Sequence, residues 1–142
     1  MEVYQVEFSI GQSASFSRTV TETDITLFAG LSGDYNPIHV DKEYAKQTFF
    51  GERISHGLLT ASFLSRLLGM HLPGPGSIYV SQTLNFTKPV YIGDTITALA
   101  EVIKIDKEKR LLTLKTTCVN QAGSIVLDGE GVMKLPKKEN NR

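Results

Sequence analysis

The feature that most constrains this sequence is the segment at residues 57–68, which is apolar on nearly every face of a helix. A surface helix shows one apolar stripe, whereas a helix that is apolar most of the way round has to be wrapped by other structure. The segment is shorter than the roughly 20 apolar residues that cross a membrane. It therefore predicts a buried helix, ended by Gly69 and Pro73, in a domain without a membrane span. Its apolar positions are Leu58, Leu59, Ala61, Phe63, Leu64, Leu67 and Leu68.

Strand patterns lie on both sides of this helix. One strand is expected before it, at residues 13–20. The strands expected after it are separated by turn signals, so the last three should be antiparallel neighbours; they lie at residues 77–86, 95–105, 110–120 and 124–135. A strand, then helices, then a meander is the order of an α+β fold. A single long central helix wrapped by a curved antiparallel sheet satisfies both patterns.

The segment between the first strand and the main helix is expected to hold short helices and loops. Thr21, with an aspartate three residues later, predicts a helix start. Residues 33–39 are rich in Gly, Asp, Asn and Pro, which predicts a loop. Asp41 should begin one or two helical turns, followed by a second loop at residues 48–55.

Length and composition restrict the class of protein. A chain of 142 residues, 41% of them hydrophobic, suits one domain, here residues 1–136 with a polar tail at residues 137–142. Basic and acidic residues balance at 15 each, so nothing indicates a nucleic-acid partner. Residues 1–10 do not resemble a secretory signal, and the lone Cys118 rules out an internal disulfide. We therefore expect a cytoplasmic protein in which Cys118 is a sheet residue and not a nucleophile.

The densest group of reactive side chains lies in residues 33–39, where Asp34 and His39 stand on either side of Pro37. A carboxylate and an imidazole within reach of one substrate atom are the minimum for general acid–base catalysis. The residue types support an alternative equally well, with Asp34 and Asn36 as turn residues and His39 as a satisfied buried donor. The spacing by itself does not decide between the two.

Residues 55–57, Ser-His-Gly, stand at the start of the main helix. The N–H groups of a helix N-terminus lack intrahelical partners, and glycine lets a ligand oxygen come close to the backbone. The Gly57 N–H is thus a candidate donor to a substrate carbonyl. On the residues alone, a cap at Ser55 or His56, with Gly57 avoiding a clash, is the better supported alternative.

Three stretches of the chain carry a resemblance to a known family. They read FAGLSGDYNPIH at residues 28–39, with Ala45 after it, FGERISHGLL at residues 50–59, and LPGPGSIY at residues 72–79. The first looks like the hydratase 2 motif of the MaoC-like (R)-specific enoyl-CoA hydratases, and the others follow in that family's order. The resemblance covers most of the chain.

The resemblance implies a hotdog fold, a homodimer and syn addition of water to trans-2-enoyl-CoA, giving (R)-3-hydroxyacyl-CoA. It assigns Asp34 as the group that takes a proton from water and His39 as the group that delivers one to the α-carbon. Asn36 becomes an orienting residue and the Gly57 N–H an oxyanion donor. No metal and no cofactor is expected, apart from the coenzyme A that is part of the substrate.

One further position follows from the same resemblance. A serine that supports the site from the central helix in some bacterial members matches Ser65. Ser62, one turn earlier, is the alternative.

Two rival functions remain open. An acyl-CoA thioesterase, or a non-catalytic acyl-thioester binding protein, would need the pocket but not the set Asp34, Asn36 and His39. A metal site of His39, His56 and Asp34 or Asp41 has no tight ligand spacing to support it.

Overall fold

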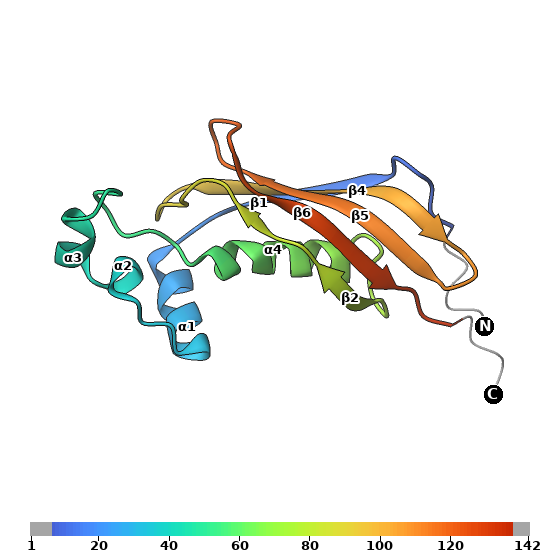
Figure 1. Cartoon of the computed structure of the whole chain (residues 1–142), viewed down its shortest axis with the longest axis horizontal. Coiled ribbons are helices and arrows are strands. Elements are labelled where there is room, and N and C mark those ends of the chain that lie inside the picture. The colour runs from blue at the N-terminus through green and yellow to red at the C-terminus, as the bar shows by residue number, and fades with distance from the viewer. Residues whose placement is uncertain (1–6, 138–142) are drawn as a thin grey trace.

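The computed structural model describes residues 7–137, and Figure 1 shows how their helices and strands are arranged. The elements in chain order are β1 (Ser13–Thr19), α1 (Glu22–Ser32), α2 (Pro37–Val40), α3 (Lys42–Lys46), α4 (Gly57–Met70), β2 (Ile78–Gln82), β3 (Asn85–Phe86), β4 (Thr95–Asp106), β5 (Leu111–Val119) and β6 (Ile125–Lys134). This order confirms the α+β class that the sequence predicts.

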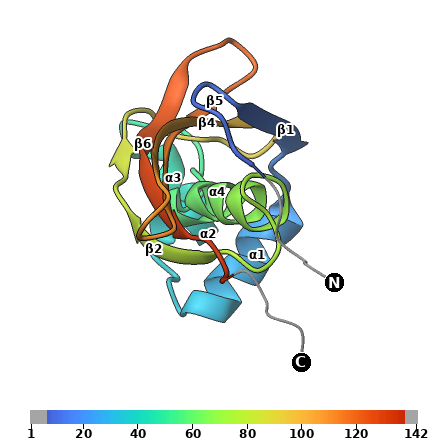
Figure 2. The same ribbon diagram turned by 90° about the vertical axis from the view of Figure 1, so that its right-hand side faces the viewer.

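The strands form one 6-stranded antiparallel sheet in the order β1-β4-β5-β6-β2, with β3 also paired to β6. The neighbours β4, β5 and β6 are joined by short turns, as expected from the turn signals. Buried and exposed residues alternate along these long strands, so one face of the sheet is apolar. Figure 2 shows that the sheet curls around α4. The buried strand residues share one core cluster with α4, so the apolar face is the inward one.

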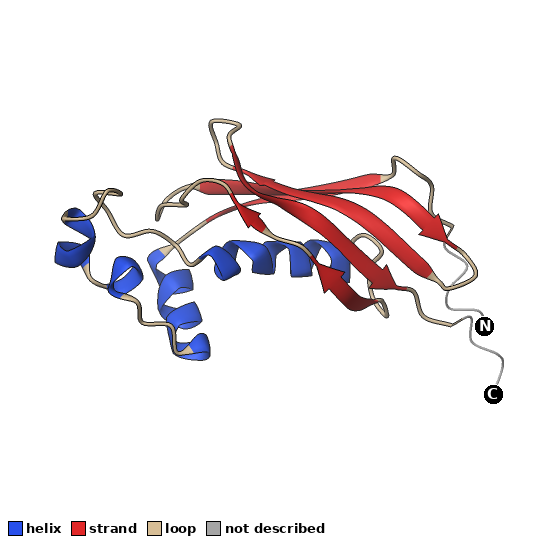
Figure 3. Ribbon diagram, in the orientation of Figure 1, coloured by secondary structure: helices blue, strands red, loops and turns tan. Residues whose placement is uncertain are grey.

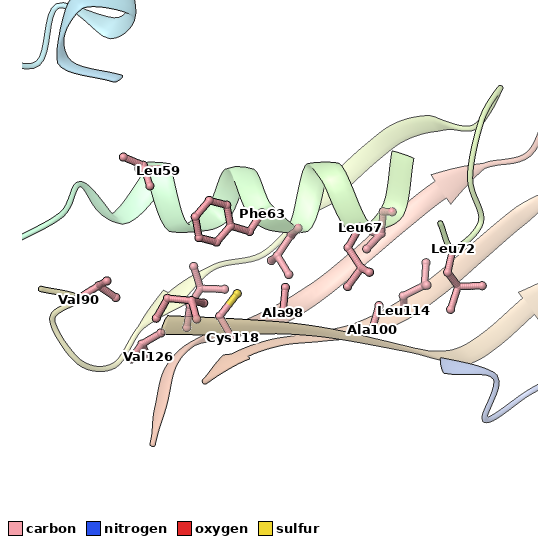
Figure 4. Close-up of a cluster of buried hydrophobic side chains, with 14 of the residues drawn as sticks. Leu59, Phe63, Leu67, Leu72, Val90, Ala98, Ala100, Leu114, Cys118 and Val126 are labelled. Carbon is pink, nitrogen blue, oxygen red and sulfur yellow. The ribbon is translucent and has the colours of Figure 1, made fainter. Parts of the chain in front are cut away.

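The helix α4 fills the concave side of the sheet. Its fully buried residues Leu64, Leu67 and Leu68 lie in one core cluster with residues from every long strand. Small side chains on β4, at Ala98 and Ala100, leave room for the helix to approach the sheet (Figure 4). None of the helices in residues 7–137, α4 included, is long and apolar enough to cross a membrane.

The wrapping of α4 is less complete than its composition predicts. Leu58 and Met70 are 58% and 63% exposed, and Ser62, Ser65 and Arg66 are exposed as well. A strip of the helix surface therefore faces away from the chain's own sheet.

The helices α1, α2 and α3 lie beyond the end of the sheet, near the start of α4 (Figure 3). Helix α1 begins with a capping box, in which Thr21 Oγ1 accepts the Asp24 N–H and the Asp24 carboxylate accepts the Thr21 N–H. The guanidinium of Arg53 pairs with both carboxylate oxygens of Glu22. This pair fastens the loop before α4 to α1.

Three predicted boundaries are wrong. The strand expected at residues 77–86 is interrupted after Gln82, where the Thr83 carbonyl comes so close to Gly129 that a Cβ there would lie 1.8 Å from its oxygen. The helix α4 runs through Gly69 to Met70, because one helical glycine costs only about 1 kcal/mol. The loop expected at residues 33–39 contains the start of the helical turn α2, which Asn36 caps.

Cys118 lies on β5 at the centre of the core and is fully buried. Burial raises the pKa of its thiol to about 12. Little thiolate exists near neutral pH under these conditions, which suits a packing residue better than a nucleophile.

Candidate active site

A cavity of about 580 Å³ lies where the start of α4 meets α1, α2 and the chain after β3. This volume is within the range of small-molecule sites. Both apolar and polar side chains line it, and the polar ones come from α1, α2, the start of α4 and the chain after β3. The polar or charged lining residues are Ser32, Asp34, His39, Ser55, His56, Thr60, Thr87 and Lys88.

Hydrogen bonds fix Asp34 in the turn after α1. Its N–H donates to Ser32 Oγ (3.1 Å), its Oδ1 accepts the Asn36 N–H (3.1 Å), and its carbonyl accepts a hydrogen bond from His56 Nε2 (3.0 Å). Its second carboxylate oxygen, Oδ2, lies 4.0 Å from His39 Nε2. One carboxylate oxygen is thus used to hold the turn, and the other faces the imidazole.

His39 is placed by the helical turn α2. Asn36 Oδ1 accepts the Ile38 N–H (3.2 Å), and Pro37 occupies the first helical position, where a missing N–H costs nothing. The His39 ring is buried, and its Nδ1 donates to the Ile54 carbonyl (2.7 Å). Because a carbonyl only accepts, the ring proton belongs on Nδ1, and Nε2 presents its lone pair to Asp34.

Burial lowers the pKa of His39 below the ordinary histidine value. The Ile54 carbonyl and the Asp34 carboxylate oppose this change, whereas the neighbouring His56 adds to it. The ring is therefore mainly neutral at pH 7. Asp34 Oδ2 and His39 Nε2 then act as two hydrogen-bond acceptors, and one water about 2.8 Å from each can span their 4.0 Å separation.

His56 contacts both members of this pair. Its ring stacks on the His39 ring, with centroids 3.9 Å apart and an interplanar angle of 28°. Asp34, His39 and His56 are also the possible ligands of the rival metal site, and one ligand atom from each lies within 4.8 Å of the others. That spread is wider than the roughly 3.3 Å between ligands bonded at 2.0–2.1 Å to tetrahedral zinc. Asp41 belongs elsewhere, as the cap of α3.

Gly57 is the first residue of α4 and lines the cavity. Among residues 7–137, its N–H has no backbone acceptor, as expected at a helix start. A Cβ at this position would lie 2.7 Å from the Phe86 ring. The absence of a side chain at Gly57 therefore avoids a clash with Phe86, which is the alternative role considered from the sequence. This role leaves the Gly57 N–H available to a ligand. Neither Ser55 nor His56 caps α4 with its side chain.

The structure brings together Asp34, His39 and Gly57 at the cavity, with Asn36 supporting both the aspartate turn and α2. Ser65 is not brought to this group: it is exposed on α4 and does not line the cavity. The alternative, Ser62, is also exposed, and its hydroxyl donates to the Leu59 carbonyl.

Sequence reasoning missed the side chain of His56 and the carbonyl of Ile54 as parts of the site. The sequence offered His56 only as a helix cap beside Gly57 or as a ligand of the rival metal site, and neither points to a residue that positions Asp34 and His39. No side-chain pattern reveals that a carbonyl of a distant loop will orient an imidazole.

The curled antiparallel sheet and the helix on its concave side define a hotdog-fold domain, in which Asp34 and His39 meet near the start of that helix. A family model described as the MaoC like domain matches residues 6–122. The chain belongs to the MaoC-like family.

Similar proteins share both the sequence and the fold. The chain is 50% identical over 135 residues to a protein of Rhodospirillum rubrum named (R)-specific enoyl-CoA hydratase, covering 95% of this chain and 93% of the relative. The solved (R)-hydratase from Aeromonas caviae, described as involved in PHA biosynthesis, superposes with a TM-score of 0.88 at 43% identity, covering 91% of this chain and 98% of that one. The R-hydratase PhaJ1 of Pseudomonas aeruginosa gives a TM-score of 0.88 at 41% identity, over 96% and 90%.

Proposed function

We propose that this protein is an (R)-specific enoyl-CoA hydratase, a hydro-lyase that reversibly adds water to trans-2-enoyl-CoA and gives (R)-3-hydroxyacyl-CoA. The observation that carries the proposal is the placement of Asp34 Oδ2 4.0 Å from His39 Nε2 in a cavity that Gly57 also lines. The names of relatives that are 50% and 44% identical support the same reaction.

The nucleophile in this proposal is a water that donates one hydrogen bond to Asp34 Oδ2 and one to His39 Nε2. Its oxygen attacks the β-carbon, and the π electrons move toward the α-carbon and the carbonyl. The proton that leaves the water passes to the Asp34–His39 pair, and His39 Nε2 delivers it to the α-carbon. Both new bonds form on the side of the substrate that faces this pair, which makes the addition syn. Positioned proton transfer of this kind is worth about 100- to 10,000-fold in rate.

The thioester carbonyl accepts the Gly57 N–H in this arrangement. The β-carbon is electrophilic only as far as the carbonyl oxygen can take up charge, so a donor fixed at that oxygen lowers the barrier to attack. The positive end of the α4 dipole acts in the same direction. Removing one oxyanion donor typically costs about 100- to 1,000-fold in rate.

The acyl carrier that we propose is coenzyme A. Lys88 is exposed and is the only Lys or Arg among the described residues that line the cavity. Its ammonium group can approach the phosphates of the carrier while the acyl chain occupies the apolar part of the cavity.

We also propose that the chain forms a homodimer. Strand β2 is an edge of the sheet and leaves Ile78 and Val80 65% and 56% exposed. An exposed apolar edge strand is normally covered or paired. A second copy on this edge would cover the apolar surface, and the mass in solution, measured by sedimentation, tests this point.

Steady-state kinetics with crotonyl-CoA test the proposed reaction against both rivals. Hydration removes the absorbance of the conjugated enoyl thioester without releasing thiol, whereas a thioesterase releases free coenzyme A and a binding protein does neither. A metal-dependent reaction would be abolished by prior dialysis against EDTA and restored by added Zn²⁺. The proposal requires hydration without thiol release that survives this dialysis.

A further inference from the structure

We propose that His56 is a positioning residue that holds the parts of the site in one arrangement, an inference that rests on the proposed hydratase function. The His56 side chain contacts Asp34 and His39, and the residue immediately precedes Gly57 in the chain. It is 2% exposed and lines the cavity, so it belongs to the cavity wall and not to the outer surface of the protein. Each of its contacts constrains a different part of the site.

The first contact is with the turn that carries Asp34. The Nε2–H of His56 donates to the Asp34 carbonyl at 3.0 Å. The remaining hydrogen bonds of Asp34 are to Ser32 and Asn36, which belong to the same turn. The bond from His56 is therefore the one that fixes this turn relative to α4.

The second contact is with the imidazole of His39. The two rings stack with centroids 3.9 Å apart, while Phe28 packs against His56 at 4.8 Å. The hydrogen bond from His39 Nδ1 to Ile54 fixes one point of the His39 ring, but the ring can still tilt about that bond. The flat face of His56 opposes that tilt and keeps Nε2 directed at Asp34.

Helix capping does not explain why a histidine occupies this position. His56 is the N-cap residue of α4, yet its side chain makes no cap hydrogen bond. Its Nδ1 is buried and has no hydrogen-bond partner in the described part of the chain. What the site uses is a flat ring with one N–H at Nε2. A phenylalanine supplies only the ring, and a glutamine supplies only an N–H donor at a similar distance from the backbone.

Matched variants separate these contributions. His56→Phe retains the stacked ring and removes the bond to Asp34, and His56→Gln does the reverse. His71→Gln is the control, because His71 is exposed at the opposite end of α4. Thermal unfolding establishes that each variant is folded at the assay temperature. The value of kcat is calculated with the total protein concentration.

Both His56 variants should lose about 100-fold in kcat while KM changes by less than about threefold, because misplacing reacting groups by about 1 Å acts on the chemical step. His71→Gln should match the wild-type protein. A folded His56→Phe and a folded His56→Gln that both retain kcat within about threefold of the control would overturn the proposal. A loss confined to KM would overturn it as well.

An NMR titration of His39 supplies a readout that does not depend on activity. The charged and titratable groups beside the His39 ring are Asp34 and His56, and Arg53 donates to the His39 carbonyl; burial is the main cause of the lowered pKa of His39. In His56→Gln the ring that covers His39 is lost, so the pKa of His39 should rise toward the ordinary value; an unchanged titration contradicts the stacking role. If the wild-type protein does not hydrate crotonyl-CoA, the proposed function fails, and this titration alone decides whether His56 holds His39.

Discussion

Removal of the backbone N–H at Gly57 is the sharpest perturbation that the site offers. Proline lacks this N–H, and the first position of a helix is where proline is best tolerated. The preceding residue, His56, has φ −58° and ψ 135°, which a following proline allows. Any Cβ at residue 57 would meet the Phe86 ring at 2.7 Å, so the substitution is made together with Phe86→Ala. Phe86 is 53% exposed, and its truncation should leave the fold intact.

The matched control is Gly57→Ala in the same Phe86→Ala background, which has the added Cβ but keeps the N–H. The double variant with proline should have a kcat about 100- to 1,000-fold below that of the double variant with alanine, equivalent to about 2.7–4 kcal/mol of transition-state stabilisation. The assay is the initial rate of crotonyl-CoA hydration, with circular dichroism to verify the helix content. If both double variants, folded, differ by less than about tenfold, the Gly57 N–H is not the oxyanion donor.

Further predictions concern pH, the carrier and stability. In the proposed mechanism the neutral His39 ring accepts the water, and burial lowers the pKa of this ring, so kcat/KM should be level above about pH 6.5 and fall at lower pH; a fall that begins above this value contradicts the assignment. Unfolded His39 takes up a proton more readily than folded His39, so its contribution to stability should be complete above about pH 6.5 and be lost as the pH falls through the folded pKa, as urea unfolding at several pH values will show. Lys88→Met should raise KM for crotonyl-CoA about two- to fivefold at low salt, with little change in kcat and a smaller effect at 0.5 M NaCl. Leu64→Ala, in the fully buried face of α4, should lower the free energy of unfolding by about 2–5 kcal/mol, and a loss below about 1 kcal/mol would contradict its place in the core.

The fold was predictable because its strongest patterns are local. The apolar segment at residues 57–68 predicted the central helix, and the turn signals predicted the meander of β4, β5 and β6. The errors arose where distant residues decide local structure. At the gap between β2 and β3 the Thr83 carbonyl closely approaches Gly129, which lies far away in the sequence. Gly69 was expected to end a helix that continues to Met70.

The candidate site was predictable only in part. The proximity of Asp34 and His39 follows from one short segment, and the resemblance to a family chose between catalysis and an ordinary turn. The role of His56 was not predictable, because its contacts with the Asp34 carbonyl and the His39 ring depend on how α4 meets the preceding loops. Ser65, matched through the family resemblance, is exposed on α4 outside the cavity, so its role stays a prediction.

The most direct test of the central claim is the hydration of crotonyl-CoA by the wild-type protein, Asp34→Asn and His39→Gln, with chiral analysis of the product. We expect (R)-3-hydroxybutyryl-CoA from the wild-type protein and a loss of about 100- to 10,000-fold in kcat for each folded variant. An (S) product, or folded variants that retain the wild-type rate, would contradict it.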